Sequence, residues 1–295
     1  MLAEFDLDMQ ANLDGALARL DRDKGQGRAA IMALAGGTNL IVDLRAGRVA
    51  PKTVLAIDRI GALRGIVSDQ GRVTVGALTT VSDLLEHKDM GAWAPSLVEA
   101  AKVFAGQMVR NTATVAGNIC CGSPAADLVP PLLSLDAVLT LSSKSGNRTV
   151  ALADFYTGYK TDLRRPDELV TAIAWSKPDV PGANLFYKLA RRRGDAITVV
   201  GVAVTLAASN FTCSRARIAL GAVAPTCLRA KGAEATLEGQ RLTPVLIAAA
   251  AEQAVREASP IDDIRASAEY RRHIVGVLVR RLLTAAAERI GQGGA

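Results

Sequence analysis

The chain has 295 residues, of which 49% are hydrophobic and 22% charged, so it is expected to fold and not to remain disordered. At roughly 100 to 200 residues per domain, this length predicts about two domains. The net charge of +6 arises wholly from Pro178 onward, where 16 basic residues accompany 10 acidic ones, but aromatic residues make up only 4%. This composition argues against a nucleic-acid surface and favours a solvated face or a docking surface for an acidic partner.

The first part of the chain is predicted to contain short helices and strands. Apolar spacing indicates an amphipathic helix over residues 14–20, and the apolar run 29–34 is typical of a buried strand. Residues 53–57 are predicted to form another strand, and 65–67 and 72–75 a hairpin.

Two further helices are marked by their first residues. Thr80 and Asp83 have the spacing of a capping box, and Pro95 suits a first helical turn, where a missing N–H costs little. From residue 106 to residue 131 the chain is rich in small and polar residues with weak periodicity. We expect a long ordered loop region there, and such regions often carry function.

Regular structure is predicted to return with a helix near 126–135 and strands at 137–141 and 168–175. From residue 184 onward, the chain is predicted to contain strands followed by helices. Further strands are expected at 184–190, 198–207 and 215–221, and alanine-rich helices at 243–257 and 268–290. This order predicts an α+β fold and not a parallel βαβ array.

A domain boundary is predicted in the segment 176–182, which contains two prolines and a glycine. We therefore expect one domain at residues 1–177 and a second at residues 178–295.

The first candidate ligand loop consists of Ala35, Gly36, Gly37, Thr38, Asn39 and Leu40. A strand that ends in Gly-Gly-Thr can expose consecutive backbone N–H groups, which bind phosphate well. The loop lacks the lysine of a Walker motif and does not match G-x-G-x-x-G. Taken alone, it is compatible with a phosphate site or with a plain tight turn.

The second candidate loop runs from Arg110 to Asp127 and offers hydroxyl, amide and carboxylate groups. Its threonines and asparagines could satisfy backbone groups in turns, and Asp127 could cap a helix. However, two such loops in one histidine-poor domain favour a large ligand with a diphosphate, such as a dinucleotide.

Cysteine and histidine are too scarce for most metal sites. The chain has two histidines and four cysteines, no C-x-x-C pair, and Cys120 directly beside Cys121. We expect no metal ligand and no iron–sulfur cluster in this chain, so redox chemistry would need an organic cofactor or a partner. The acidic start and the shortness of the apolar stretches predict a cytoplasmic chain without a membrane span.

Together, the loops strongly resemble the FAD-binding medium subunit of the molybdenum hydroxylases, the family of xanthine dehydrogenase and carbon monoxide dehydrogenase. The resemblance rests on A-G-G-T-N-L at 35–40, R-N-x-A-T-V-A-G-N at 110–118 and S-P-A-A-D at 123–127. It continues in order through F-Y-T-G-Y at 155–159, P-D-E-L at 166–169, Y-K-L-A-R-R at 187–192 and D-I-R-A-S-A-E-Y-R-R at 263–272. It therefore covers nearly the whole chain.

The resemblance implies a two-part FAD-binding domain of the vanillyl-alcohol-oxidase-like (PCMH) type. A smaller C-terminal domain of antiparallel strands and helices, of the carbon monoxide dehydrogenase flavoprotein type, would follow. It also implies noncovalent FAD bound by Ala35, Gly36, Gly37, Thr38, Asn39, Leu40, Phe104, Ala113, Thr114, Gly117, Asn118, Cys121, Asp127, Val170 and Lys188.

Within this implied set, the backbone of residues 35–40 would cradle the pyrophosphate. Thr114, Gly117 and Asn118 would hold the pyrophosphate and the adenosine side, and Asp127 would bond ribityl or ribose hydroxyls. A valine in place of Gly37 is predicted to block the approach of the phosphate.

Three residues in the set have ordinary alternatives. Phe104 and Val170, the implied apolar contacts, could equally be core residues, and Lys188 could be a surface residue. If Lys188 lies beside the isoalloxazine, its charge would stabilise reduced flavin and raise the flavin potential.

By the same resemblance, the chain would be the electron-transfer subunit of a heterotrimeric molybdenum hydroxylase. Electrons would pass from a small [2Fe-2S] subunit through FAD to NAD, a quinone or oxygen, and a large molybdopterin subunit would oxidise the substrate. A dimer of heterotrimers is expected, with no catalytic residue and no metal ligand in this chain. The alternative is a free-standing FAD-dependent oxidase or reductase, which would need acid–base groups over the flavin.

Overall fold

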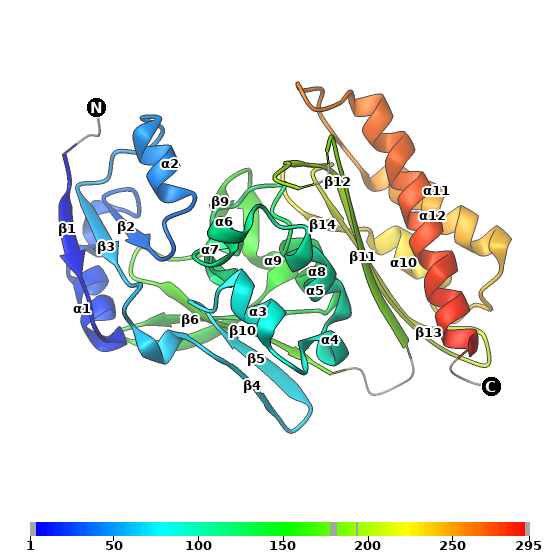
Figure 1. The fold of residues 1–295 in the computed structure, drawn as a ribbon, viewed down its shortest axis with the longest axis horizontal. Coiled ribbons are helices and arrows are strands. Elements are labelled where there is room, and N and C mark those ends of the chain that lie inside the picture. Colours follow the sequence, from blue (N-terminus) through cyan, green and yellow to red (C-terminus); the bar gives the residue numbers. More distant parts are fainter. Residues whose placement is uncertain (1–3, 178–181, 193, 293–295) are drawn as a thin grey trace.

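The computed structural model describes residues 4–177, 182–192 and 194–292. Figure 1 shows that the chain runs along the longest axis of the molecule, with the N-terminal strands at one end and the C-terminal helices at the other. Helices and mainly antiparallel sheets make up the described chain, which confirms the predicted α+β class.

The N-terminal end is a small parallel sheet with strand order β1-β3-β2. Its strands are β1 (Asp6–Met9), β3 (Thr53–Ala56) and β2 (Ile31–Leu34), and helix α1 (Leu13–Asp23) packs against them. Helix α2 (Leu40–Arg45) follows β2 after a short loop. The 3-10 turns η1 (Lys24–Gln26) and η2 (Gly61–Leu63) belong to the same end.

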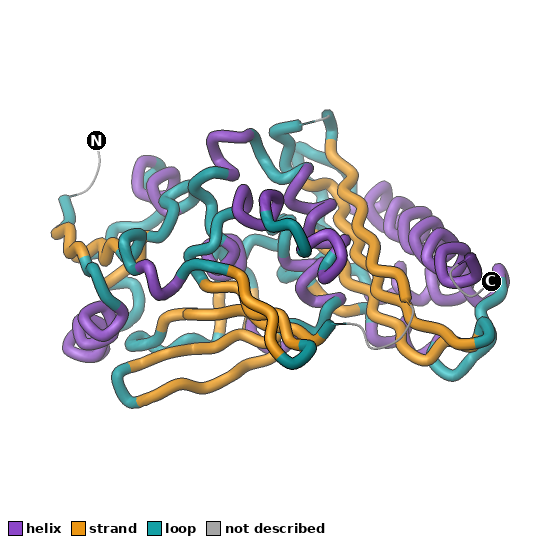
Figure 2. The backbone as a smooth tube through the Cα atoms, turned by 60° about the horizontal axis from the view of Figure 1, so that its bottom comes forward, coloured by secondary structure: helices purple, strands orange, loops and turns teal. Residues whose placement is uncertain are grey.

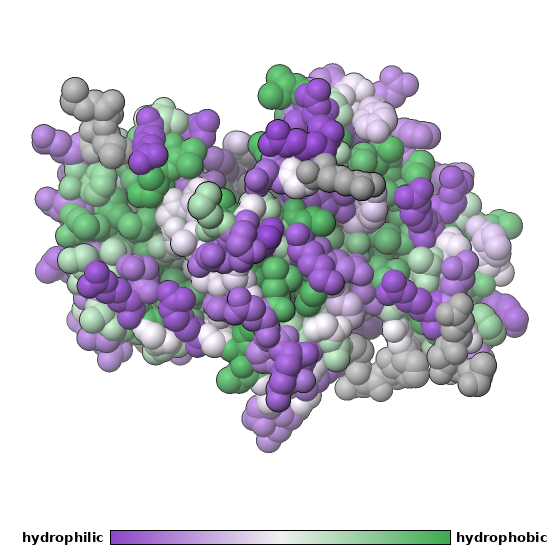
Figure 3. Space-filling view, in the orientation of Figure 1, coloured by the Kyte–Doolittle hydropathy of each residue, from purple (hydrophilic) through white to green (hydrophobic). Residues whose placement is uncertain are grey.

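A five-stranded antiparallel sheet forms the centre, in the order β4-β5-β10-β6-β7. Its strands are β4 (Ile66–Asp69), β5 (Arg72–Gly76), β10 (Leu169–Ser176), β6 (Val138–Ser143) and β7 (Gly146–Ala151). The tip of the β4–β5 hairpin projects at the lower edge of the molecule and is hydrophilic in Figure 3.

Short helices cover this sheet and contribute to the largest apolar core. They are α3 (Val81–Glu86), α4 (Met90–Trp93), α5 (Pro95–Lys102), α6 (Gln107–Arg110), α7 (Val115–Cys120), α8 (Val129–Ser134) and α9 (Leu152–Phe155), followed by the small strands β8 (Tyr156–Gly158) and β9 (Thr161–Asp162). The capping box at Thr80 and Asp83 and the start of α5 at Pro95 are present as predicted.

The C-terminal part is a four-stranded antiparallel sheet between two layers of helices (Figure 2). The elements are β11 (Gly182–Ala190), β12 (Thr198–Ser209), β13 (Thr212–Gly221), β14 (Leu228–Arg229), α10 (Lys231–Leu237), α11 (Pro244–Glu257) and α12 (Ala268–Gln292). Strand periodicity explains the two layers. Leu185 and Val202 face the core under α11 and α12, whereas Phe186 and Ala203 join the central core.

The prediction of a continuous loop over residues 106–131 was wrong. Helices α6 and α7 lie within it, and α8 starts at Val129 instead of near residue 126. Helices of one or two turns are too short to show helical periodicity, and this stretch has too few large apolar side chains to display it.

The strands β1, β7 and β14 and the helix α10 were also missed by sequence reasoning, because they are short or largely exposed. Residues 178–181 of the expected boundary segment lie outside the described residues. None of the described helices is both long enough and apolar enough to cross a bilayer.

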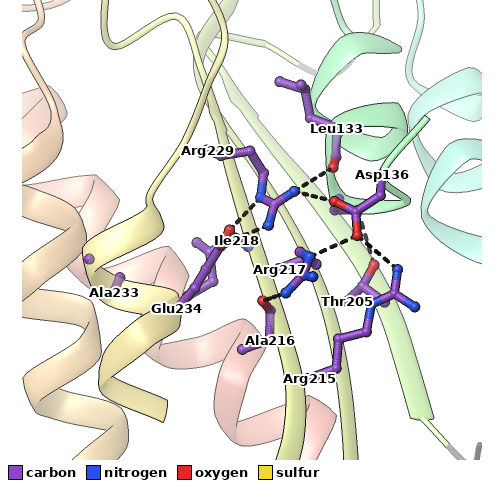
Figure 4. A network of polar contacts seen from close by, with 12 residues as sticks. Leu133, Asp136, Thr205, Arg215, Ala216, Arg217, Ile218, Arg229, Ala233 and Glu234 are labelled. Atoms are coloured by element: carbon purple, nitrogen blue, oxygen red, sulfur yellow. Dashed lines mark hydrogen bonds and ion pairs between the residues drawn. The ribbon is translucent and has the colours of Figure 1, made fainter. Parts of the chain in front are cut away.

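An ionic cluster joins the central part of the fold to the C-terminal sheet (Figure 4). Asp136, between α8 and β6, accepts hydrogen bonds from Arg215 at 2.9 Å, Arg217 at 2.8 Å and Arg229 at 2.5 Å. Arg229 also pairs with the buried Glu234 of α10. One carboxylate thus connects three arginines of the C-terminal sheet to the preceding part of the chain.

We predict that Asp136→Asn lowers the free energy of unfolding by about 1 to 2 kcal/mol, because the cluster is partly exposed. Asparagine tolerates the positive φ of 52° at this position, so the substitution mainly removes the charge. Chemical denaturation at pH 7 checks this, with the exposed Asp154→Asn as control. An Asp136→Asn protein as stable as wild type would show that the cluster adds no stability.

Candidate functional site

The loop from Ala35 to Leu40 lies directly against the second candidate loop. A Cβ added at Gly36 would stand 1.7 Å from the backbone oxygen of Thr112, so only glycine permits this approach. Gly37 has a φ of +71°, a left-handed conformation that also favours glycine. Both glycines are therefore favoured by the backbone, and Gly36 is the one that allows the two predicted loops to touch.

The same loop presents backbone donors. Within residues 4–177, 182–192 and 194–292, the N–H groups of Gly37, Thr38 and Asn39 donate no hydrogen bond to another protein group. The Asn39 side chain turns away to Asp43, to whose carboxylate it donates a hydrogen bond of 2.8 Å. Three successive amides thus remain available to an anionic ligand.

The second loop is held in shape by its own polar side chains. Thr114 is the N-cap of α7, and its hydroxyl accepts a hydrogen bond of 3.1 Å from the N–H of Gly117. The side-chain oxygen of Asn118 accepts a 3.2 Å bond from the N–H of Leu128. Asn118 therefore ties α7 to the segment that carries Asp127.

Cys121 is part of the same turn. Its thiol donates a hydrogen bond of 3.0 Å to the backbone oxygen of Asn118, and burial raises the pKa of the thiol. The side chain is therefore a neutral packing group and not a reactive thiolate.

Asp127 and Lys188 form a buried ion pair. The Lys188 Nζ lies 2.6 Å from Asp127 Oδ2 and 3.2 Å from the backbone oxygen of Val103, and the lysine side chain is only 4% exposed. Lys188 is thus not a surface residue. Of its three N–H donors, the described residues accept two, which leaves one for a ligand.

Asp127 does not cap a helix, because α8 begins at Val129 and its N-cap, Leu128, has no side-chain bond. Burial raises the pKa of Asp127, and the charge of Lys188 only partly opposes this effect. The carboxylate is thus in a costly environment that requires hydrogen-bond donors.

The remaining predicted residues lie in or against the central core. Ala113 is 4% exposed and Val170 is 5% exposed, both within it, whereas Phe104 is half-buried and packs on its edge. Phe104 is next to Val103, which contacts Lys188, so it can meet a ligand more readily than Val170 can.

Sequence reasoning missed two side chains that shape the site. Arg110 donates hydrogen bonds to the backbone oxygens of Phe104 and Ala105, at 2.9 and 2.7 Å, and so fixes that segment. Thr198 donates to Asp127 at 2.5 Å from the start of β12. Arg110 stands in the quoted motif and could have been found, but no sequence signal marks Thr198.

Surface shape alone would not have found this region. A shallow hollow between α11 and α12, lined by residues such as Ala251, Val255 and Gly276, contains none of the predicted site residues. Among the described residues, no group of three or more His, Cys, Asp and Glu side chains is arranged to hold a metal ion.

The fold and the two joined loops define a flavin-binding protein class. The chain belongs to the medium-subunit family of the molybdopterin dehydrogenases: residues 6–175 match the FAD binding domain in molybdopterin dehydrogenase, and residues 185–286 match the CO dehydrogenase flavoprotein C-terminal domain. This confirms the resemblance drawn from the sequence motifs.

Individual relatives are similar in sequence to this chain over most of its length. The carbon monoxide dehydrogenase medium chain of Hydrogenophaga pseudoflava is 35% identical over 253 residues, covering 86% of this chain and 88% of that protein. The xanthine dehydrogenase FAD-binding subunit of Escherichia coli O157:H7 is 31% identical over 260 residues, covering 88% of this chain and 89% of that protein. These relatives are subunits of oxidoreductases.

Solved structures of such proteins have the same fold as this chain. A chain of carbon monoxide dehydrogenase from Hydrogenophaga pseudoflava superposes with a TM-score of 0.92 at 34% identity, over 98% of this chain and 99% of that one. A chain of quinoline 2-oxidoreductase from Pseudomonas putida 86 superposes with a TM-score of 0.88 at 26% identity, over 98% of both chains.

Proposed function

We propose that this chain is the FAD-binding electron-transfer subunit of a molybdenum hydroxylase. The observation that carries the proposal is the contact between Gly36 and Thr112, which joins two loops of a matched FAD-binding domain beside three available backbone amides. Bound FAD would accept electrons one at a time and deliver them as a pair.

The residues proposed to hold FAD are the fifteen predicted from the sequence. The amides of Gly37, Thr38 and Asn39 would bind the pyrophosphate, and the buried ion pair of Asp127 and Lys188 would lie toward the ribityl chain and the flavin ring. The buried position of Lys188 supports a role inside the site. The chain would contribute binding and electrostatics and no acid–base group of its own.

The proposal extends to the assembly. We place a large molybdopterin subunit and a small [2Fe-2S] subunit beside this chain, in a cytoplasmic dimer of heterotrimers. We also propose the domain limits 1–177 and 178–295, which are supported by the separate apolar core beneath α11 and α12.

The test is to isolate the full chain with its co-purifying subunits and record its absorption spectrum. Acid precipitation should release free FAD into the supernatant, because no covalent attachment is proposed. Flavin that stays with the precipitate, FMN in the supernatant, or a colourless preparation would contradict the proposal. Turnover of a donor by the chain alone would favour a free-standing oxidase.

A further inference from the structure

Asp127 receives hydrogen bonds from two different strands of the C-terminal sheet. Lys188 of β11 donates to Oδ2 at 2.6 Å, and the hydroxyl of Thr198 of β12 donates to Oδ1 at 2.5 Å. Thr198 is 3% exposed, so this hydroxyl is shielded from water. The C-terminal part of the chain therefore supplies a donor to each oxygen of a carboxylate in the FAD-binding part.

Thr198 is itself held from the other side. Its backbone oxygen accepts a hydrogen bond of 2.9 Å from Arg265, and Arg265 is paired with Asp263 at 2.6 Å. Asp263 also pairs with Arg271, whose side chain is almost fully buried. The backbone of Thr198 is thus held by this ionic group in addition to the bond between its hydroxyl and Asp127.

We propose that Thr198 is a positioning residue of the flavin site, whose hydroxyl keeps the Asp127 carboxylate ionised and aimed at Lys188. The inference rests on the proposed function, since it takes Lys188 to face the flavin. Among the described residues, Lys188 of β11 and Thr198 of β12 donate hydrogen bonds to Asp127. The nearby thiol of Cys227, in the segment before β14, donates to the backbone oxygen of Pro124, and burial raises the pKa of that thiol.

The consequence concerns the charge beside the flavin. A hydroxyl donor favours the ionised form of a carboxylate, so its loss raises the pKa of Asp127 further. Between the old and the new pKa, Asp127 is protonated in the variant and ionised in wild type. Lys188 is then an uncompensated cation in the variant, which stabilises reduced flavin and raises its midpoint potential within that pH interval.

The experiment compares wild type, Thr198→Val and Thr198→Ser as FAD-loaded protein, and records the flavin midpoint potential over the whole pH range in which the protein keeps its FAD. Ionisation of Asp127 should appear as a change of slope in the potential–pH curve. In Thr198→Val this change of slope should lie about one pH unit higher, a tenfold change in the acid dissociation constant of Asp127. Thr198→Ser, which keeps the hydroxyl, should restore the wild-type curve. Thr198→Ala serves as a second hydroxyl-free variant if the valine variant does not fold.

The matched control is Thr205→Val on the same strand, whose hydroxyl bonds Ser134 and Asn184 and not Asp127. Thr205→Val should weaken the contact between β12 and α8 without shifting the potential–pH curve. If FAD-replete Thr198→Val and Thr198→Ala proteins show the wild-type curve, the inference is overturned but the proposed function is not. Wild-type protein that binds no FAD would overturn the proposed function and the inference with it.

Discussion

Replacing Gly36 by alanine is expected to give a folded protein that has lost most of its affinity for FAD. The added Cβ would stand 1.7 Å from the Thr112 backbone oxygen and 2.5 Å from its carbonyl carbon, whereas ordinary contacts begin at 3.4 Å. The neighbouring atoms belong to the backbone, so no side chain can rotate away. The two loops must separate, and the amides of Gly37 and Thr38 move with the first loop.

We expect the FAD dissociation constant to rise at least 100-fold, equivalent to about 2.7 kcal/mol, because the cradle is assembled from both loops. Titration of FAD into apoprotein measures this, and circular dichroism confirms that the variant is folded. Gly61→Ala is the matched control, since a Cβ there meets nothing within 4 Å. Tight FAD binding by a folded Gly36→Ala variant would remove this loop contact from the site.

The structure shows that the two glycines differ in how much space they leave for a side chain. The sequence predicts that a valine at Gly37 blocks the phosphate. In the structure a Cβ at Gly37 would meet only the side chains of Ile41 and Leu34, at 3.3 Å, although the φ of +71° makes any L residue strained. Gly36 has the more severe steric restriction, and its cause is a residue 76 positions away in the sequence, Thr112.

Local patterns therefore predicted the elements better than the contacts between them. The capping box at Thr80, the proline at the start of α5 and the long strands of the C-terminal sheet follow from nearby residues, and each is present. The pairing of β1 with β3 and the three-arginine cluster at Asp136 depend on chain segments that meet only in the folded molecule. No local periodicity encodes such contacts.

The same distinction applies to the site. The loops at 35–40 and 110–127 could be identified from their residue types, because glycine, threonine and asparagine suit a phosphate cradle. The pairing of Asp127 with Lys188 could not, since those residues come from different parts of the chain. Likewise, the sequence does not indicate whether Lys188 is exposed or buried. The side chain is buried because β11 lies against the segment that carries Asp127.

Replacing Lys188 by methionine is expected to lower the flavin midpoint potential while leaving much of the FAD bound. Methionine preserves the length and packing of the side chain but removes the cation that would stabilise reduced flavin. The nearby Asp127 already compensates part of this charge, so the net effect is smaller than that of an isolated cation. We expect a decrease of roughly 20 to 40 mV, which for a two-electron couple corresponds to about 1 to 2 kcal/mol.

The ion pair makes a double-mutant cycle the decisive measurement. Lys188→Met leaves Asp127 buried without its cationic partner and raises the pKa of that carboxyl further; at a pH where Asp127 stays ionised, the unpaired anion would itself lower the potential. If that anion causes the whole effect, Lys188→Met combined with Asp127→Asn will regain the wild-type potential. If the lysine acts directly on the flavin, the double variant will stay below wild type.

Redox titration of FAD-replete variants distinguishes these cases, with the exposed Lys102→Met as control. An unchanged potential in Lys188→Met, with full FAD occupancy, would mean that the ion pair only joins the two parts of the fold. A potential that stays below wild type in the double variant as well, with FAD retained, would assign the buried lysine to tuning of the flavin, because a purely structural bond between β11 and the segment that carries Asp127 does not distinguish oxidised from reduced cofactor.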